Sequence, residues 1–108
     1  MKQITIYWRD IPSQIILKKG RNKTKELLSP RFQKAIDRAA MRAGKGGSQA
    51  YIEEWRRETI EIDSTADPCV VVTEEVLAIE SRYSDSDLEA LIRNRGVALS
   101  ALSAKRNT

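Results

Sequence analysis

The segment SPRFQKAIDRAAMRAG, residues Ser29 to Gly44, carries the most consistent set of helix signals in the chain. Ser29 is suited to cap the first free amides, Pro30 suits the first helical position, and Gly44 favours termination. Apolar side chains recur at helical spacing on one face: Phe32, Ile36, Ala39 or Ala40, and Ala43. We therefore expect an amphipathic helix that buries this face against the rest of the domain.

Two strand-like segments precede this helix. Gln3 to Arg9 alternates isoleucine and tryptophan with threonine and tyrosine, and Ser13 to Lys18 is a second apolar segment. Arg9 to Pro12 is predicted to be the turn between them, because Pro12 fixes its own φ and disfavours helix at the residue before it. These segments predict an antiparallel hairpin. The helix is expected to bury Phe32 and Ile36 against one or more of its side chains: Ile4, Ile6 or Trp8.

A strongly basic stretch follows the hairpin. It carries five positive charges in eight residues: Lys18, Lys19, Arg21, Lys23 and Lys25. Such a loop between a strand and a helix is usually only solvated, but it also suits contacts to phosphates or other anions, which need no sequence specificity. The other glycine-containing stretch, Gly44 to Ser48, follows a helix instead of preceding one, so it is interpreted as a linker and not as a phosphate-binding loop.

The segment from Ala50 to Ile62 fits either a helix or a strand. We expect a helical turn over Tyr51 to Arg56 and a strand over Glu58 to Asp63 that joins the hairpin. Trp55 is either a core anchor or, together with Arg56 and Arg57, part of a cationic aromatic patch.

Two further helices are predicted towards the C-terminus. Asp67 and Pro68 resemble a cap and a first-turn proline, and apolar residues then recur to Tyr83. Ser86 to Arg95 has a capping box in Ser86 and Glu89 and a stop signal in Gly96. Residues 97–108 are either a short helix or a flexible tail.

These elements predict one α+β domain over residues 1–96. Its sheet is expected to be small and antiparallel or mixed, formed by the hairpin and a third strand. One central helix and one or two C-terminal helices are expected to pack on it. A chain of 108 residues is long enough to build one hydrophobic core.

The charge of the chain is distributed unevenly. Residues 1–57 have a balance of +9 and residues 58–108 a balance of −5. Either the two halves attract each other within the fold, or the basic half offers a surface to an acidic partner. Binding of nucleic acid or another polyanion through the basic half is therefore one alternative function.

The residues that catalysis usually needs are scarce. The chain has no histidine and one cysteine, Cys69, which excludes imidazole catalysis and the zinc and iron–sulfur sites that need several such ligands in one chain. We therefore predict no catalytic residue, no metal ligand and no cofactor. A small-molecule enzyme or carrier that uses lysine or carboxylate groups remains an alternative. The N-terminus resembles no signal peptide and no apolar run is long enough to span a bilayer, so a cytoplasmic protein without membrane contact is expected.

The aromatic and cationic residues suggest a site for a protein partner. The hypothesis is that the hairpin turn and the segment after the linker come together, and that Asp10 orients Arg9 or Arg56. The candidate partner-binding residues are Trp8, Arg9, Asp10, Tyr51, Trp55, Arg56 and Arg57.

Three separated blocks, ITIYWRDIPSQIILKKGR, RFQKAIDRAAMRAG and AYIEEWRR, resemble the small bacterial virulence factor domain family, up to about Tyr83. The resemblance implies an accessory role near cofactor metabolism, either iron–sulfur or cobalamin- and folate-dependent methyl transfer, and assigns no catalytic residue. The leading expectation is a non-catalytic accessory protein that binds another protein, either an enzyme or an assembly factor.

Overall fold

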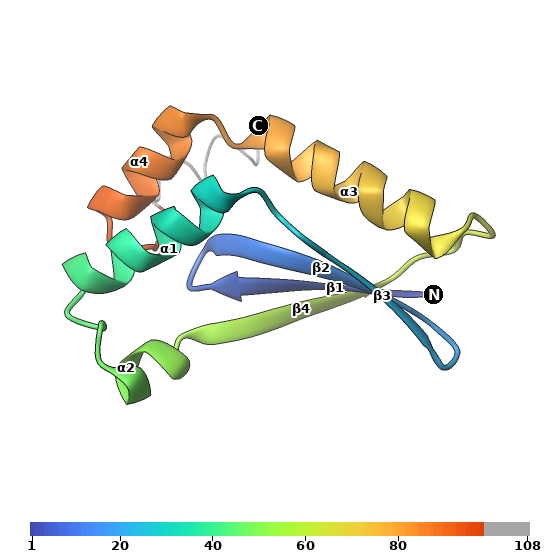
Figure 1. Ribbon diagram of the computed structural model, residues 1–108, viewed down its shortest axis with the longest axis horizontal. Coiled ribbons are helices and arrows are strands. Elements are labelled where there is room, and N and C mark those ends of the chain that lie inside the picture. Colours follow the sequence, from blue (N-terminus) through green and yellow to red (C-terminus); the bar gives the residue numbers. More distant parts are fainter. Residues whose placement is uncertain (99–108) are drawn as a thin grey trace.

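A computed structural model of the chain describes residues 1–98, so most of the predicted tail over 97–108 lies outside the described residues. The elements are β1 (Lys2–Trp8), β2 (Ile11–Lys19), β3 (Asn22–Leu27), α1 (Pro30–Arg42), α2 (Ser48–Ile52), β4 (Trp55–Glu61), α3 (Pro68–Arg82) and α4 (Asp85–Arg93). The strands form one sheet in the order β3-β2-β1-β4 (Figure 1). All three pairings are antiparallel, which confirms the α+β class and settles the sheet as antiparallel.

The first hairpin is tighter than predicted. Its turn consists of Arg9 and Asp10 alone, with Arg9 in the left-handed region at φ 54°, and β2 begins at Ile11. Pro12 therefore lies inside a strand, opposite Tyr7, where the register shifts between Ile6 and Tyr7. Because a bulge already interrupts the ladder there, the missing amide of the proline is tolerated. The predicted antiparallel hairpin is confirmed, and its predicted turn over Arg9 to Pro12 is confirmed for Arg9 and Asp10 alone.

The basic stretch is a second hairpin and not a loop. β2 continues to Lys19, Gly20 turns the chain at φ 62°, and β3 pairs with β2 from Asn22 to Leu27. β3 is an edge strand with nearly all of its residues exposed, so it lacks the apolar alternation that marks a strand in sequence. Pairing with the apolar β2 stabilises it instead.

The boundary between α2 and β4 also differs from the prediction. α2 begins at Ser48, within the predicted linker, and ends at Ile52, whereas β4 starts at Trp55. Trp55 and Arg56 therefore belong to a strand, not to a helical turn. Their register opposite Trp8 and Tyr7 explains this, because pairing with β1 supplies the backbone partners that a single helical turn lacks.

The central helix is confirmed, with Phe32 1% and Ile36 0% exposed. Both belong to a core cluster that also holds Trp8, Ile11, Ile15 and Leu17. The prediction that Phe32 and Ile36 pack against Ile4, Ile6 or Trp8 is confirmed for Trp8, whereas Ile4 and Ile6 are not part of this cluster. Ile4 and Ile6 lie opposite Ile16 and Gln14, whereas Ile15 and Leu17 point to the other face of the sheet.

The two C-terminal helices begin at local caps. The Asp67 carboxylate accepts a hydrogen bond of 2.8 Å from the Cys69 amide, as the Asp-Pro signal predicted. α4 is capped two residues earlier than predicted, with Ser84 and Asp87 as its capping box instead of Ser86 and Glu89. Both pairs fit the sequence pattern, and Ser84 is used because α3 ends immediately before it.

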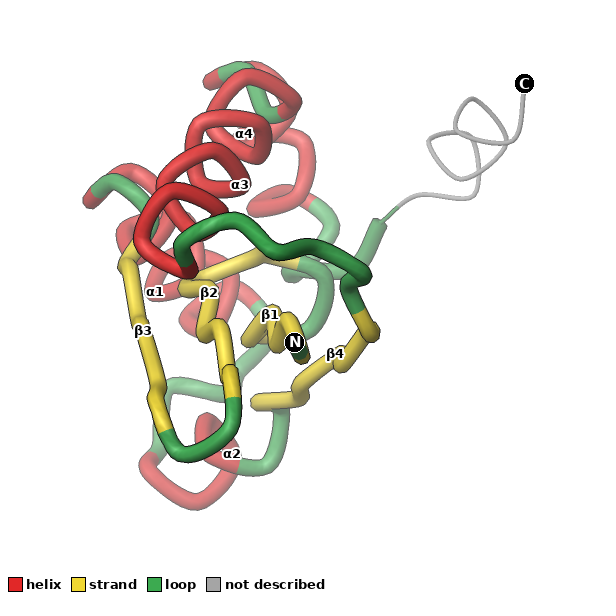
Figure 2. The backbone as a smooth tube through the Cα atoms, turned by 90° about the vertical axis from the view of Figure 1, so that its right-hand side faces the viewer, coloured by secondary structure: helices red, strands yellow, loops and turns green. Residues whose placement is uncertain are grey.

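The helices α1, α3 and α4 lie on one side of the sheet (Figure 1). α3 packs on β2 and β3, and α1 packs on β2 and α4. β3 and β4 form the two opposite edges of the sheet (Figure 2). Among residues 1–98, no helix packs on the second face of the sheet or along the β4 edge. Within residues 1–98, no helix is long and apolar enough to cross a membrane.

Candidate functional site

Six of the seven predicted partner-binding residues meet at one end of the sheet. We call them the turn cluster: Trp8, Arg9, Asp10, Tyr51, Trp55 and Arg56. The β1–β2 turn, α2 and the start of β4 bring them together, because Arg9 continues the β1–β4 ladder by donating its amide to the Glu54 carbonyl at 3.1 Å.

The aromatic part of the turn cluster is structural. Trp8 is fully buried, and its indole N–H donates to the Tyr51 carbonyl at 2.9 Å. Its ring stacks on Tyr51 at 5.8 Å between centroids, and Tyr51 meets Trp55 edge to face at 5.7 Å. Gly96, at φ 86°, allows the chain to pass the indole, because a β-carbon there would lie 3.0 Å from Trp8. Trp8 is thus a core anchor, and Trp55 is half-buried against the same core.

The charged part of the turn cluster is internally paired. Arg9 contacts the Glu54 carboxylate and the Arg95 carbonyl, each at 3.0 Å. Asp10 accepts from Arg56 at 3.1 Å through one oxygen and from the Ala98 amide at 2.6 Å through the other. The predicted orientation of Arg56 by Asp10 is therefore present, through a single hydrogen bond.

Arg56 is further fixed by its neighbours. Its Nε donates to the Arg9 carbonyl at 2.8 Å, its guanidinium lies 4.3 Å from the centre of the Tyr7 ring, and Glu58 pairs with it. Burial alone lowers the pKa of Arg56, but the hydrogen bonds to Glu58 and Asp10 outweigh it and the pKa is raised. Burial, followed by the nearby Glu58 carboxylate, raises the pKa of the Tyr7 hydroxyl. These contacts hold Arg56 in one place.

Arg57, the seventh predicted residue, points to the other face of the sheet, because neighbours along a strand alternate. It belongs to what we call the open face, the face away from the helices. Residues directly opposite each other share a face, so the register defines its members as Lys2, Ile4, Ile6, Gln14, Ile16, Lys18, Lys23, Lys25, Leu27, Arg57, Thr59 and Glu61. The register also gives Trp8, Ile11 and Trp55 the same alternation, but at this end of the sheet they pack into or against the core and are not part of the open face.

The centre of the open face is apolar and its margins are basic. Ile4 is buried, and Ile6 and Ile16 are half-buried. Five cations surround them: Lys2, Lys18, Lys23, Lys25 and Arg57. Three of these cations are in the basic segment identified from sequence, whereas Lys19 pairs with Asn22 on the other side of the strand and Arg21 lies in the turn.

Three lysines form a row across the open face. Lys2 lies opposite Lys18, and Lys18 lies opposite Lys23. Like charges directly opposite each other destabilise a sheet, and none of the three is in an ion pair with another residue of the described chain. This row was missed because the contact between Lys2 and Lys18 depends on strand register. An anionic ligand would relieve the repulsion.

An open hollow of about 370 Å³ adjoins the lysine row. Its lining combines the row with the β2–β3 turn and the start of the chain: Met1, Lys2, Lys18, Lys19, Gly20 and Glu61. Glu61 is engaged by the N-terminal ammonium at 3.7 Å. The lining is more suited to an anion than to a small apolar substrate.

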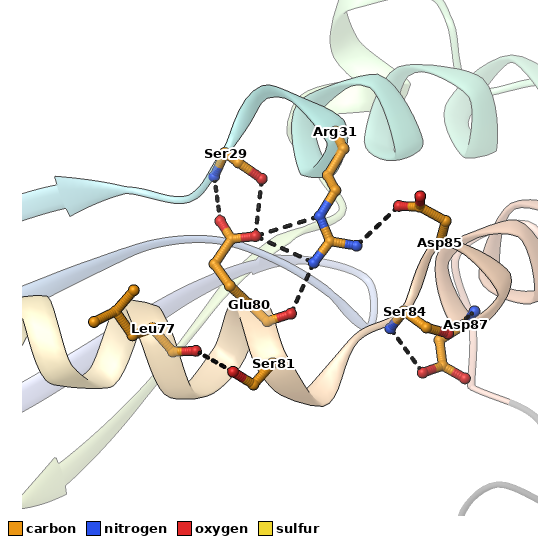
Figure 3. Close-up of polar contacts among 8 residues, drawn as sticks. All are labelled: Ser29, Arg31, Leu77, Glu80, Ser81, Ser84, Asp85 and Asp87. Atoms are coloured by element: carbon orange, nitrogen blue, oxygen red, sulfur yellow. Dashed lines mark hydrogen bonds and ion pairs between the residues drawn. The ribbon is translucent and has the colours of Figure 1, made fainter.

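A second charged group, missed from sequence, links three helices (Figure 3). The Glu80 carboxylate accepts from the Ser29 amide at 2.6 Å and from the Ser29 hydroxyl at 2.9 Å. The Arg31 guanidinium donates to a carboxylate oxygen of Glu80 at 3.1 Å and to one of Asp85 at 3.2 Å. Burial alone raises the pKa of Glu80, but the hydrogen bonds from Ser29 and Arg31 outweigh it and hold the pKa below its usual range. This group stabilises the helix layer.

The structure offers little that resembles a metal site. Among residues 1–98, no three carboxylate or thiol side chains converge as metal ligands would. Cys69 is exposed at the start of α3, and it stays a prediction that this thiol is neither catalytic nor a metal ligand.

Comparison with known proteins gives one positive result. No curated protein and no solved structure matches the chain. The family model described as virulence factor matches residues 6–92, which includes β1 from Ile6, all four helices to Ile92, and every predicted partner-binding residue. The resemblance drawn from the three sequence blocks is confirmed, and the chain belongs to the virulence factor family.

Proposed function

We propose that this domain is a non-catalytic binding protein, and that its ligand is an acidic surface of another protein that docks on the open face of the sheet. The observation that supports this most directly is the row of Lys2, Lys18 and Lys23. Within residues 1–98 these three ammonium groups have no ion-pair partner and lie side by side next to the apolar centre, and carboxylates from a partner would neutralise them.

The composition of the open face supports a protein ligand more than a single-stranded nucleic acid. Proteins that bind single strands stack bases on exposed aromatic rings, whereas the centre of this face is isoleucine. The aromatic residues of the neighbouring turn cluster, Trp8, Tyr51 and Trp55, pack into or against the core instead. Isoleucine surrounded by lysine stems suits a partner that has a small apolar contact within an acidic border.

The turn cluster fits a supporting role. Arg9 and Arg56 would have to leave Glu54 and Asp10 before they could bind a partner, and this exchange reduces the net gain. Arg57 remains in the proposed site because it lies on the open face. The family resemblance favours an enzyme or assembly factor of cofactor metabolism as the partner.

The test compares capture by the tagged full chain with capture by the Lys18→Glu/Lys23→Glu variant, from nuclease-treated native extract. Carbodiimide cross-linking, which joins amines directly to carboxylates, is applied before purification. We expect a partner whose Asp or Glu residues are joined to lysines of the open face, and we expect the variant to lose it. The matched control is Lys34→Glu/Arg38→Glu, which makes the same charge change on the exposed side of α1.

Three results would contradict the proposal. The first is equal capture by the open-face variant, and the second is equal loss with the α1 control. The third comes from titrating the purified chain with a fluorescent single-stranded oligonucleotide at two salt concentrations. Tight binding that falls steeply with salt, and that the open-face variant abolishes, would assign the open face to a polyanion instead.

A further inference from the structure

The direction of the backbone groups on β4 follows from the ends of its ladder with β1. Met1 and Ile62 exchange two hydrogen bonds, at 3.0 and 2.8 Å. Hydrogen-bonded pairs alternate with non-hydrogen-bonded pairs in an antiparallel ladder. In the observed register, the inward-pointing backbone groups belong to Arg56, Glu58 and Ile60. The amides and carbonyls of Arg57, Thr59 and Glu61 therefore point away from the sheet.

Within residues 1–98, this outer edge lacks most of the features that usually protect a sheet edge from pairing with another strand. Such features are lysines and other charged side chains, prolines, bulges, short length or a covering helix. Of these, β4 has only charged side chains, namely Arg56, Arg57, Glu58 and Glu61. β4 has seven residues, contains neither lysine nor proline, and pairs with β1 without a register shift. It is exposed from Arg56 to Glu61. The other edge strand, β3, carries Lys23 and Lys25 and is packed by α3.

We propose that β4 pairs antiparallel with β4 of a second copy, in a register centred on Thr59. The charges of the strand select this register. With Thr59 opposite Thr59 of the second copy, Arg57 lies opposite the second copy's Glu61, and this pairing occurs twice by symmetry. A centre at Arg57 or at Glu58 instead places two like charges opposite each other, which destabilises the pair.

The geometry is compatible with the observed fold. Antiparallel pairing of two identical edges requires a two-fold axis perpendicular to the sheet, so the helices of both copies stay on one side. The outward backbone groups of Arg57, Thr59 and Glu61 form three hydrogen-bonded residue pairs, or about six hydrogen bonds. The dimer joins two four-stranded sheets into a continuous eight-stranded sheet and makes the two open faces contiguous.

The first test measures the mass of the full chain by light scattering and by sedimentation over a concentration series. We expect a dimer, about twice the monomer mass of 12.2 kDa. Thr59→Pro should be monomeric. The thermal unfolding midpoint of this monomer should equal that of the wild-type monomer, since the amide that proline removes points away from β1. A monomeric wild type, including one whose β4 edge binds a strand of another protein, would overturn the proposal.

A charge exchange tests the register. Arg57→Glu and Glu61→Arg each replace two attractive pairs with two repulsive ones, so each should raise the dimer dissociation constant roughly tenfold. The double variant Arg57→Glu/Glu61→Arg restores opposite charges and should return the constant towards the wild-type value. If the double variant weakens the dimer by the product of the two single-variant factors in dissociation constant, the two residues do not interact and the proposed register is wrong.

Cross-linking tests the same register without charge. In a Cys69→Ser background, Thr59→Cys places two thiols opposite each other at a backbone spacing of about 5.5 Å, which a disulfide spans. Mild oxidation should give a covalent dimer. The matched control is Glu58→Cys in the same background, because Glu58 lies opposite the second copy's Ile60. Equal cross-linking at both positions would contradict a register centred on Thr59.

Discussion

The arginines of the turn cluster and the lysines of the open face carry the same charge, but the fold uses them differently. Arg9 and Arg56 each contact a carboxylate and a backbone carbonyl, whereas Lys18 and Lys23 have no ion-pair partner in the described chain. The planar guanidinium suits such multiple contacts, and the flexible ammonium does not. Positive charge that is already paired stabilises the molecule, and positive charge left unpaired is available to a ligand.

The largest expected effect is on the turn cluster. Trp8→Ala removes a fully buried indole and its hydrogen bond to Tyr51, so it should lower the free energy of unfolding by about 3–5 kcal/mol. Urea denaturation followed by circular dichroism measures this. A Trp8→Ala variant that kept its stability but lost partner capture would contradict the distinction between a structural turn cluster and a binding open face, because the turn cluster would then be a recognition surface.

The Glu80 carboxylate of the helix layer should make stability depend on pH. The pKa of Glu80 is lower in the folded state than in the unfolded chain, so its contribution is complete above the unfolded pKa, about 4.3, and is lost as the pH falls through the folded value. Glu80→Gln should lower stability at neutral pH by about 2 kcal/mol, since it weakens charged hydrogen bonds from Ser29 and Arg31. It should also reduce the fall in the free energy of unfolding at acidic pH, measured by urea denaturation at a series of pH values. An unchanged dependence on pH would exclude this role for Glu80.

Asp10 should have a smaller effect because it is partly exposed. Asp10→Ala removes the acceptor for Arg56 and for the Ala98 amide, and we expect a loss of about 1–2 kcal/mol. Asp10→Asn keeps an acceptor oxygen and should lose less. The two thermal midpoints, compared at low and high salt, separate the hydrogen bonds from the screened charge attraction. Equal midpoints for both variants and the wild type would show that the pairing does not stabilise the fold.

The smallest expected effect has the opposite sign. Lys18→Glu places a carboxylate between Lys2 and Lys23, so it should raise stability by roughly 0.5 kcal/mol at low salt while it weakens partner binding. The gain should vanish at high salt, as screening predicts. Lys34→Glu on α1 is the control and should change neither quantity appreciably. A destabilised Lys18→Glu variant would mean that Lys18 has a favourable partner within the fold.

Sequence signals sufficed where the relevant contact is local. α1 follows from Pro30, whose fixed φ suits the first helical position, and α3 begins where Asp67 accepts from the Cys69 amide. The predicted cap by Ser29 was wrong, because the Ser29 hydroxyl donates to Glu80 and makes no bond to an amide of α1. β3 could not be predicted in the same way, since Asn22–Leu27 has no apolar alternation and is stabilised by its pairing with β2. The choice between Ser84 and Ser86 as the cap of α4 likewise depends on where α3 ends.

The same distinction holds for the candidate site. The meeting of Asp10 with Arg56 was predicted, because the aromatic and cationic residues around them suggested one cluster. The pairing of Arg31 with Glu80 was not, because it joins two helices 49 positions apart without a shared motif. Nor could the alternating faces of β4, which separate Arg57 from Arg56, be recognised while Trp55 and Arg56 were assigned to a helical turn.

The strand order has a consequence for folding kinetics. β1, β2 and β3 pair through short turns, so this meander closes locally, whereas β4 returns to β1 only after α1 and α2. Contacts between residues distant in sequence form late, because their loop-closure entropy must be overcome first. β1 therefore has an unpaired edge until β4 arrives, and β4 of a neighbouring chain can occupy that edge. We expect refolding at high protein concentration to show a slow, concentration-dependent phase that refolding at low concentration lacks.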